Sequence, residues 1–468
     1  MPSARLPATE LLLGRRDLLR FGGGLALSSW WSPTLATAAP SGGPAKSCIL
    51  IYLLGGPPHL DLWDLKPDAP AEIRGPFHSI ATDVPGTRIC QHLPKLARLA
   101  SRYALIRSVS HPNHNHTPMI YYTLTGRQVD QPGQDNDVRP PQRTDAPHIG
   151  AILAKYRSSS AMFGGLPGYL AVPEVAVRSS TQGQYKRARE RLRGGGAGFL
   201  GPEYDPLAIN GDPGTPSAIP ELSLPSDVHA ARHDRRVALL SALERLGTAS
   251  QRIESFEALR RQAVVLTGAS SPARSTFSLD DEPIALKERY GPHRFGRALL
   301  LSRRLAEAGV PMIAVHFNEM TICDGWDTHA KNFEALESEL LPMLDQGLSA
   351  LIEDLDRRGV LDETLVLVMG EFGRTPRINK DAGRDHWGSC QSVLLVGGGI
   401  RGGVVVGSSD RIGAYPTADP VDPVDLHATA FHCLGLDPRR IMHDSLGRPL
   451  PLSSGRVLGE LLESVGLD

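Results

Sequence analysis

The chain of 468 residues is 41% hydrophobic and 22% charged, so it can bury a large core and lacks the composition of a disordered protein. Lys and Arg number 50 against 51 Asp and Glu, and this balance excludes a general attraction to nucleic acid or to an anionic membrane surface. The five cysteines have no Cys-x-x-Cys spacing, which argues against a thiolate metal site. Partners and function must therefore be inferred from local patterns.

The first 38 residues resemble a twin-arginine export signal. The pair Arg15 and Arg16 precedes an apolar stretch of moderate length, and Ala-Thr-Ala at positions 36–38 matches a cleavage site. A membrane anchor is the alternative, but Pro33 and several glycines leave fewer than the roughly 20 apolar residues that a spanning helix needs. We expect cleavage after Ala38, export by the twin-arginine route to the periplasm or the extracellular space, and no stable membrane span in the mature chain.

Continuous apolar runs mark the predicted strands of the mature chain. They read SCILIYLLGG, YALIRSV, GVPMIAVHF, TLVLVMG and SVLLVGG, and they begin at residues 47, 103, 309, 364 and 392. Runs of this kind are typical of strands that are buried on both faces. Helical patterns lie between them, and this alternation predicts an α/β fold with a mainly parallel sheet. We expect neighbouring central strands at residues 47–54, 312–317, 365–369 and 393–396.

Residues 128–281 differ from the rest of the chain because they are rich in Pro, Gly, Ser and Arg. We interpret this region as an insertion into a single domain of residues 39–468, covering the sheet edge or the site. The basic run at 186–193 is interpreted as a solvated helix face, with contact to a polyanion as the alternative. The expected organisation is thus a cleavable signal followed by one domain with an insertion.

Polar residues suited to metal binding follow four of the predicted strands. In chain order they are His59, Asp61 and Asp64; His111, His114 and His116; Glu319, Asp324, Asp327 and His329; and Glu371, Asp385 and His386. Ligands bind at the carboxyl ends of strands in α/β sheets, so these groups are candidates for one site. Carboxylate oxygens and imidazole nitrogens together suit Zn, Mn, Fe or Ca. The alternative for Glu371 is a surface ion pair with Arg374 that fixes a turn.

Several motifs resemble one protein family. HTP followed by YYTLTGR, at residues 116–127, is similar to the sulfatase segment in which the nucleophile precedes Thr-Pro and then Leu-Thr-Gly-Arg. A closer resemblance rests on GGPPHLDLWDLKPDAPAEIRGPF, GWDTHAKNFEAL, EFGRTPRIN and DHWG. On these motifs the chain resembles the exported bacterial family known as domain of unknown function 1501, within the alkaline phosphatase and sulfatase superfamily. The resemblance implies an alkaline phosphatase-like three-layer sandwich.

The same resemblance implies a centre with one or two divalent metal ions, Zn, Ca or Mn. Carried over by position, the ligands become Asp61 or Asp64, Asp327, His329, Glu371 and His386. His116 and Asp385 complete the set of candidate ligands. Two residues depart from the superfamily pattern. Phe372 stands where a second ligand of its loop is expected, and His116 stands where the nucleophile is expected.

Two functions are compatible with these patterns. The first is an exported metal-dependent hydrolase of phosphate or sulfate esters, in which Arg374 or Arg127 neutralises the anionic substrate. In that hydrolase His116 is a metal ligand or base, or else His116 or Thr117 is the nucleophile. A purely structural His116 is the remaining alternative. The second function is a binding scaffold that keeps the fold without the nucleophile. Neither involves nucleic acid, and no oligomeric state follows from the sequence.

Replacing Arg15 and Arg16 by lysine is expected to trap the precursor inside the cell, because the export route recognises the arginine pair. The exported wild-type protein should begin at Ala39, which terminal sequencing of the secreted fraction would establish. Recovery of an intact Met1 terminus from that fraction would contradict the cleavage.

Overall fold

The structure of the chain is a computed structural model. It describes residues 43, 45–129, 140–157, 162–163, 165–172, 177–178, 190–209, 211–215, 228–229, 231–232, 235–236, 238–239, 242, 254–267, 272–317 and 322–463. The chain divides after residue 41, and all features below belong to the unit Gly42–Asp468. The predicted signal, residues 1–38, lies outside the described residues, so its export and cleavage stay predictions. Within the described ranges, no helix is both long enough and apolar enough to span a bilayer.

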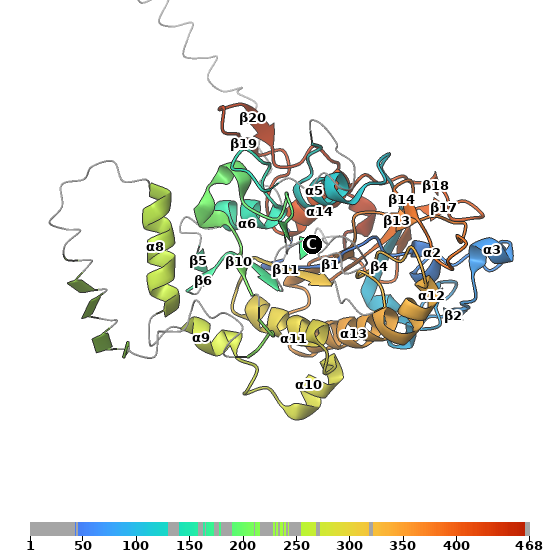
Figure 1. Ribbon diagram of the computed structural model, residues 1–468, viewed down its shortest axis with the longest axis horizontal. Coiled ribbons are helices and arrows are strands. Elements are labelled where there is room, and N and C mark those ends of the chain that lie inside the picture. The colour runs from blue at the N-terminus through green and yellow to red at the C-terminus, as the bar shows by residue number, and fades with distance from the viewer. Residues whose placement is uncertain are drawn as a thin grey trace, which may run out of the picture. The chain divides into compact units, whose positions relative to one another are not determined.

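An eight-stranded sheet forms the centre of this unit (Figure 1). Its strands, in spatial order, are β10 (Leu207–Ala208), β7 (Tyr169–Val172), β11 (Met312–Phe317), β1 (Ser47–Leu53), β12 (Thr364–Met369), β15 (Gln391–Val396), β4 (Tyr103–Val109) and β16 (Val405–Val406). The four strands predicted to be central neighbours are β11, β1, β12 and β15, and they are adjacent in this order. That prediction is confirmed.

Every strand of this sheet except β15 points in the same direction. The pairs on either side of β1 are parallel, whereas β15 is antiparallel to both β12 and β4. The reason is the connection: residues 370–390 leave the end of β12 and lead straight into β15 without a helix that crosses back. The carboxyl ends of β1, β4, β11 and β12 therefore lie at one edge of the sheet.

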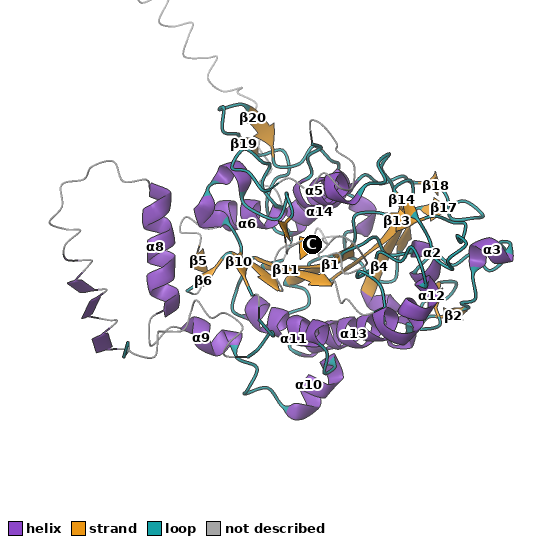
Figure 2. Cartoon of the chain, viewed as in Figure 1, coloured by secondary structure: helices purple, strands orange, loops and turns teal. Residues whose placement is uncertain are grey.

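Helices cover both faces of the sheet (Figure 2). One face packs against α11 (Arg294–Glu307) and α13 (Leu341–Arg357), and the other against α5 (His116–Thr125), α6 (Ile149–Arg157) and α14 (Pro423–Cys433). Successive residues of β1 alternate between the two resulting cores, because side chains of a strand point to opposite faces. The predicted three-layer α/β sandwich with a mainly parallel sheet is confirmed.

The structure also contains shorter helices and small two-stranded pairings. Further helices are α2 (His59–Leu62), α3 (Ala71–Arg74), α4 (Pro94–Ala97), α8 (Glu254–Thr267), α9 (Pro272–Phe277), α10 (Ile284–Tyr290) and α12 (Asn332–Ala335). Small two-stranded pairings are β2 (Ser79–Ala81) with β3 (Arg88–Cys90), β5 (Met162–Phe163) with β6 (Leu166–Pro167), β8 (Val177–Arg178) with β9 (Glu190–Arg191), β13 (Gly373–Arg374) with β14 (His386–Trp387), β17 (Ser408–Ser409) with β18 (Pro416–Ala418), and β19 (Ile441–His443) with β20 (Pro449–Pro451).

The described parts of residues 128–281 are joined to the main sheet. Strand β7 pairs in parallel with β11, and β10 extends the sheet beyond β7. Helix α6 contributes Ile152 and Leu153 to the same core as β1. The region interpreted as an insertion thus supplies one edge of the central sheet rather than only covering it.

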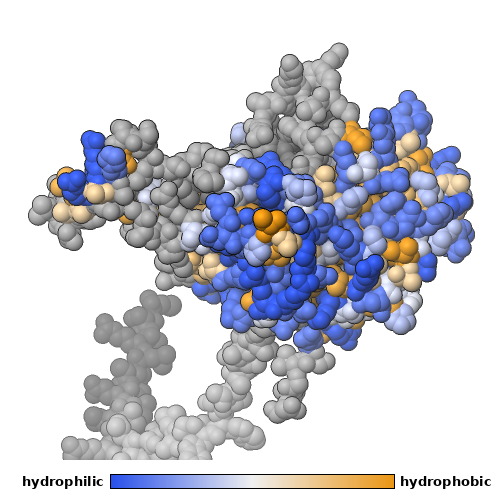
Figure 3. Space-filling view, turned by 90° about the horizontal axis from the view of Figure 1, so that it is seen from below, coloured by the Kyte–Doolittle hydropathy of each residue, from blue (hydrophilic) through white to orange (hydrophobic). Residues whose placement is uncertain are grey.

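The helix α13 shows why one face of this unit is polar. Its residues Leu344, Leu348, Leu351 and Leu355 recur at helical spacing and are fully buried against the sheet. Its half-buried Gln346, Glu353 and Asp356 and its exposed Arg357 are polar. Accordingly, the face seen in Figure 3 is mainly hydrophilic, with small apolar patches.

Buried histidines occupy the layer between the sheet and α5, α6 and α14. His427 lies on α14, and its Nε2 atom is 2.8 Å from the carbonyl oxygen of Thr123. Burial lowers the pKa of His427 from its ordinary value to about 4. Burial also lowers the pKa of His148 well below its ordinary value, and the neighbouring His316 and His427 add to this effect. Both His148 and His427 are therefore neutral in the folded protein near neutral pH.

The protein is expected to lose stability as the pH falls from about 6.5 to about 4. The unfolded chain then binds a proton at residue 427 while the folded chain does not, so the free energy of unfolding falls by roughly 3 kcal/mol from this residue. His427→Gln keeps a donor for Thr123 and should flatten this dependence in chemical unfolding at several pH values. His443→Gln, at an exposed histidine, is the control and should leave the slope unchanged.

Candidate metal centre

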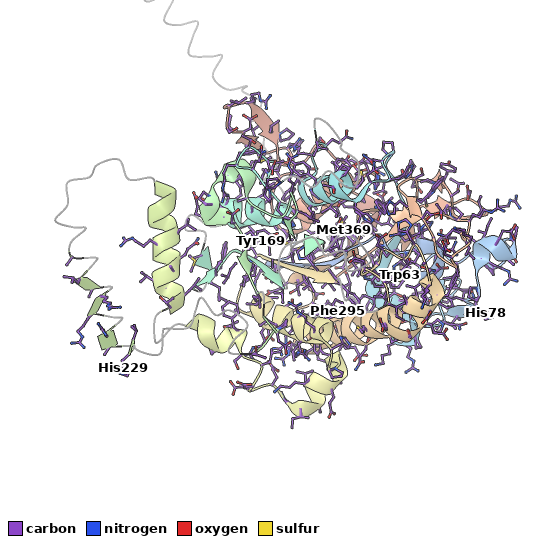
Figure 4. The ribbon with its side chains drawn as sticks, viewed as in Figure 1. Trp63, His78, Tyr169, His229, Phe295 and Met369 are labelled. Atoms are coloured by element: carbon purple, nitrogen blue, oxygen red, sulfur yellow. The ribbon has the colours of Figure 1, made fainter. Side chains whose placement is uncertain are left out.

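The candidate site lies where the carboxyl ends of four parallel strands meet. His116 is the first residue of α5, which follows β4. Asp327 and His329 lie in the loop after β11, and His386 begins β14 in the excursion between β12 and β15. Figure 4 labels Met369, the last residue of β12, from which that excursion starts. Parallel strands thus bring together residues that are more than 200 positions apart.

One carboxylate oxygen is the centre of the cluster. Asp327 Oδ1 is 3.3 Å from His116 Nε2, 3.2 Å from His329 Nε2 and 3.3 Å from His386 Nε2. The Nε2 atoms of His329 and His386 are 2.8 Å apart. The side chain of His116 is 4% exposed and that of His329 is 44% exposed. The cluster is therefore closed behind His116 and open to solvent beside His329.

These spacings fit a divalent metal ion. Ligand atoms of His116, Asp327 and His386 all lie within 4.8 Å of one another. Four ligands at the 2.0–2.1 Å bond lengths of zinc are about 3.3 Å from each other in a tetrahedron, close to the separations in this cluster. The Nε2 atoms of His329 and His386 face each other, and only one proton can lie between them. Nitrogen and carboxylate donors at this distance are the arrangement that Zn²⁺ or Mn²⁺ takes in proteins.

The hydrogen bond at the far nitrogen of His386 fixes which of its atoms is free to bind a metal. His386 Nδ1 is 2.8 Å from the carbonyl oxygen of His114. A carbonyl only accepts, so Nδ1 carries the proton and Nε2 presents its lone pair toward Asp327. Asp385 has a comparable place behind His329, since its Oδ1 atom is 2.8 Å from His329 Nδ1. Asp385 therefore supports a candidate ligand from outside the cluster.

The charges of the cluster are strongly coupled. Burial alone would lower the pKa of His116, but the carboxylates of Asp327 and Glu371 outweigh burial and raise it to about 9. Burial would raise the pKa of Asp327, yet Arg374 and then His116 hold it well below its usual range. Asp327 is thus a carboxylate throughout the physiological range, as a metal ligand must be.

Glu371 lies on the other side of His116. Its Oε1 atom is 2.6 Å from His116 Nδ1 and accepts a hydrogen bond of 2.9 Å from the backbone N–H of Gly55. Its Oε2 atom is buried without a hydrogen-bond partner among the described residues. Both Glu371 and His116 line a cavity of about 20 Å³, together with Asp324 and Asp327. Direct ligation by Glu371 stays a prediction of the sequence.

Arg374 has a different place from the one predicted. It is fully buried, and its guanidinium donates to the carbonyl oxygens of Gly55, Gly56 and Arg384 and to Asp327. The interpretation of Glu371 and Arg374 as a surface ion pair is wrong, because both are buried and Arg374 pairs with Asp327. The contact of Arg374 with an anionic substrate stays a prediction of the sequence.

Asp61 and Asp64 are engaged away from the cluster. Asp61 binds Arg384 through both oxygens, at 2.7 and 2.8 Å, and also accepts a hydrogen bond from Asn332. Asp64 pairs with Lys66 at 3.0 Å and accepts a hydrogen bond from Ser409. Since these contacts occupy their carboxylates, we do not assign either residue to the candidate centre.

Other predicted residues take supporting or separate places. Thr117 is the half-buried second residue of α5. Arg127 lies two residues beyond the other end of that helix and donates to the carbonyl of Pro451. His111 donates to the backbone carbonyl of Glu371 at 2.8 Å. Glu319 lies outside the described residues.

The sequence did not identify Gly55 as part of the site, and it gave Phe372 no role there. The ring of Phe372 packs against His116 and against His386, with ring centres 4.8 Å apart in each pair. Gly55 has φ +118°, and a Cβ atom there would lie 2.3 Å from the backbone nitrogen of Asp327. The Gly-Gly pair that ends the first apolar run was the available signal for such a close approach.

The arrangement defines an α/β protein with a candidate metal centre at the carboxyl edge of its sheet. A family model described as "Protein of unknown function (DUF1501)" matches residues 45–462, and the chain belongs to this family. The resemblance to that family in the sequence is thereby confirmed. No curated protein sequence matches the chain significantly.

Solved structures of low sequence identity are also similar to the chain. A phosphonate monoester hydrolase from Silicibacter pomeroyi is 16% identical, with a TM-score of 0.32, over 89% of this chain and 76% of its own. A sulfatase from Pseudoalteromonas sp. is 12% identical, with a TM-score of 0.34, over 88% and 71%. The TAB5 alkaline phosphatase mutant is 11% identical, with a TM-score of 0.36, over 85% and 100%. These likenesses concern the arrangement of the chain and not its activity.

Asp61→Asn is expected to destabilise the protein without removing a metal ligand. The change leaves the buried guanidinium of Arg384 without its charge partner, which costs about 3 to 5 kcal/mol in the free energy of unfolding. Chemical unfolding and elemental analysis of the folded variant would measure the two effects. The control, Glu334→Gln in the exposed pair with Lys331, should cost less than about 1 kcal/mol. Loss of metal from folded Asp61→Asn protein would instead place Asp61 at the centre.

Proposed function

We propose that the protein is a metal-dependent hydrolase of phosphate or sulfate esters. The observation that carries this proposal is the cluster of His116, Asp327 and His386, with His329 beside it, at the edge of the sheet where four strands end. A bound divalent ion supplies Lewis acidity toward the ester and lowers the pKa of water. We also propose that the protein acts outside the cytoplasm, on the basis of its predicted signal.

The donors of the cluster favour particular metals. Imidazole nitrogens with one carboxylate suit Zn²⁺ or Mn²⁺, whereas Ca²⁺ takes six to eight oxygen ligands. In this proposal His116, Asp327 and His386 hold the ion, and His329 lies at the open side. Asp327 is held by Arg374 and His386 by the carbonyl of His114, so these two ligands are oriented before an ion binds.

The contacts of His116 favour water as the attacking group. Its Nδ1 atom is bonded to Glu371, and its Nε2 atom faces Asp327, so both nitrogens are directed to protein groups. A histidine held in this way serves as a ligand rather than as the nucleophile. An ester would approach from the solvent side, where His329 is exposed and is oriented by Asp385. Buried Arg374 contributes by fixing Asp327.

Elemental analysis and an activity panel test this function. Protein purified without chelators should contain Zn or Mn and should hydrolyse p-nitrophenyl phosphate, bis-(p-nitrophenyl) phosphate or p-nitrophenyl sulfate. Asp327→Asn should lower metal affinity more than about 100-fold and abolish turnover, because it removes the shared charged ligand. Glu334→Gln, at an exposed carboxylate, should change neither property.

The two contrary outcomes are distinct. Wild-type protein that binds no divalent metal would refute the centre itself. Wild-type protein that binds metal tightly but turns over none of the three esters would refute the hydrolase and favour the binding scaffold.

A further inference from the structure

Glu371 is a fully buried carboxylate at the end of β12, and it touches the cluster through one imidazole. Its Oε1 atom faces the Nδ1 atom of His116 at 2.6 Å. The Nε2 atom of the same ring faces Asp327 Oδ1 at 3.3 Å. The two nitrogens of an imidazole point away from each other, so an oxygen bonded to Nδ1 lies on the far side of the ring from an ion bound by Nε2.

This contact determines which nitrogen of His116 can bind a metal. The Oε1 atom of Glu371 already accepts from the backbone N–H of Gly55, so we assign it as the acceptor here too, and Nδ1 of His116 carries the proton in the bond. In a ring that binds a metal, Nδ1 keeps this proton and the lone pair is on Nε2, toward Asp327 and His386. A carboxylate behind a ligating histidine also makes the ring a stronger donor.

A single residue, Gly55, contacts both charged groups behind the cluster through its backbone. The backbone N–H of Gly55 donates to Glu371 at 2.9 Å, and the carbonyl of Gly55 accepts from Arg374. Glu371 stands behind His116, while Arg374 stands behind Asp327. Gly55 comes two residues after the end of β1, and its position is therefore fixed by the central sheet.

We propose that Glu371 is a positioning residue that holds His116 in the orientation and tautomer that direct Nε2 to the metal, rather than a direct ligand. This inference rests on the proposed metal centre. It assigns Glu371 and Gly55 to the support of the centre and leaves Asp327 as its charged ligand.

Titration of the metal-free protein with Co²⁺ tests the proposal, because Co²⁺ absorption reports both affinity and ligand set. Glu371→Gln should weaken Co²⁺ binding by about 10- to 100-fold and leave the absorption bands in place, since the ligands are unchanged. Asp345→Asn is the matched control. Asp345 is also a buried carboxylate that accepts backbone N–H groups, at Leu96 and Lys95, but it lies elsewhere in the fold. It should lower stability without changing Co²⁺ affinity.

Histidine ¹⁵N NMR of the zinc-loaded wild-type protein tests the same proposal without a variant. His116 should coordinate through Nε2 and retain a proton on Nδ1. Coordination through Nδ1, a shift of the Co²⁺ bands in Glu371→Gln, or unchanged affinity in that variant would each overturn the positioning role. Failure of the wild-type protein to bind Co²⁺ or zinc would instead refute the underlying metal centre.

Discussion

The buried guanidinium of Arg374 is the interaction on which the geometry of the candidate centre depends. Its planar donors join the loop after β1, at Gly55 and Gly56, to the backbone of Arg384 and to the carboxylate of Asp327. A buried cation requires a charged partner, and Asp327 is that partner. The Oδ1 atom of Asp327, which pairs with Arg374, is also the atom that the three histidines of the cluster approach. The same carboxylate therefore takes part in the buried ion pair and in the candidate centre.

A second buried arginine extends this support to the loop that carries His386. Arg384 pairs with Asp61 through its side chain, while its backbone carbonyl accepts from Arg374. It also donates to the carbonyl of Ile73. These bonds connect the loop after β1 to the loop after β12. His386 lies two residues beyond Arg384, so its position is set by contacts with the rest of the domain.

The sequence predicted the strands better than it predicted the partners of charged residues. Apolar runs identify buried strands because burial on both faces requires them, and the predicted strand at 47–54 differs from β1 by one residue. Such runs carry no direction, so the reversal of β15 could not be predicted from them. Carboxylates after strands look alike in sequence. Asp61 and Asp327 differ because Asp61 meets a guanidinium 323 positions later, whereas Asp327 meets three histidines as well as Arg374.

The reversal of β15 has a consequence for how the site can vary. Residues 370–390 leave the sheet from β12 and return to the adjacent antiparallel strand β15. The segment carries Glu371, Arg374, Asp385 and His386 on one closed loop. A single excursion between adjacent strands thus supplies both His386 of the cluster and the buried Arg374 that holds Asp327, so a change in this segment alters the site and its support together.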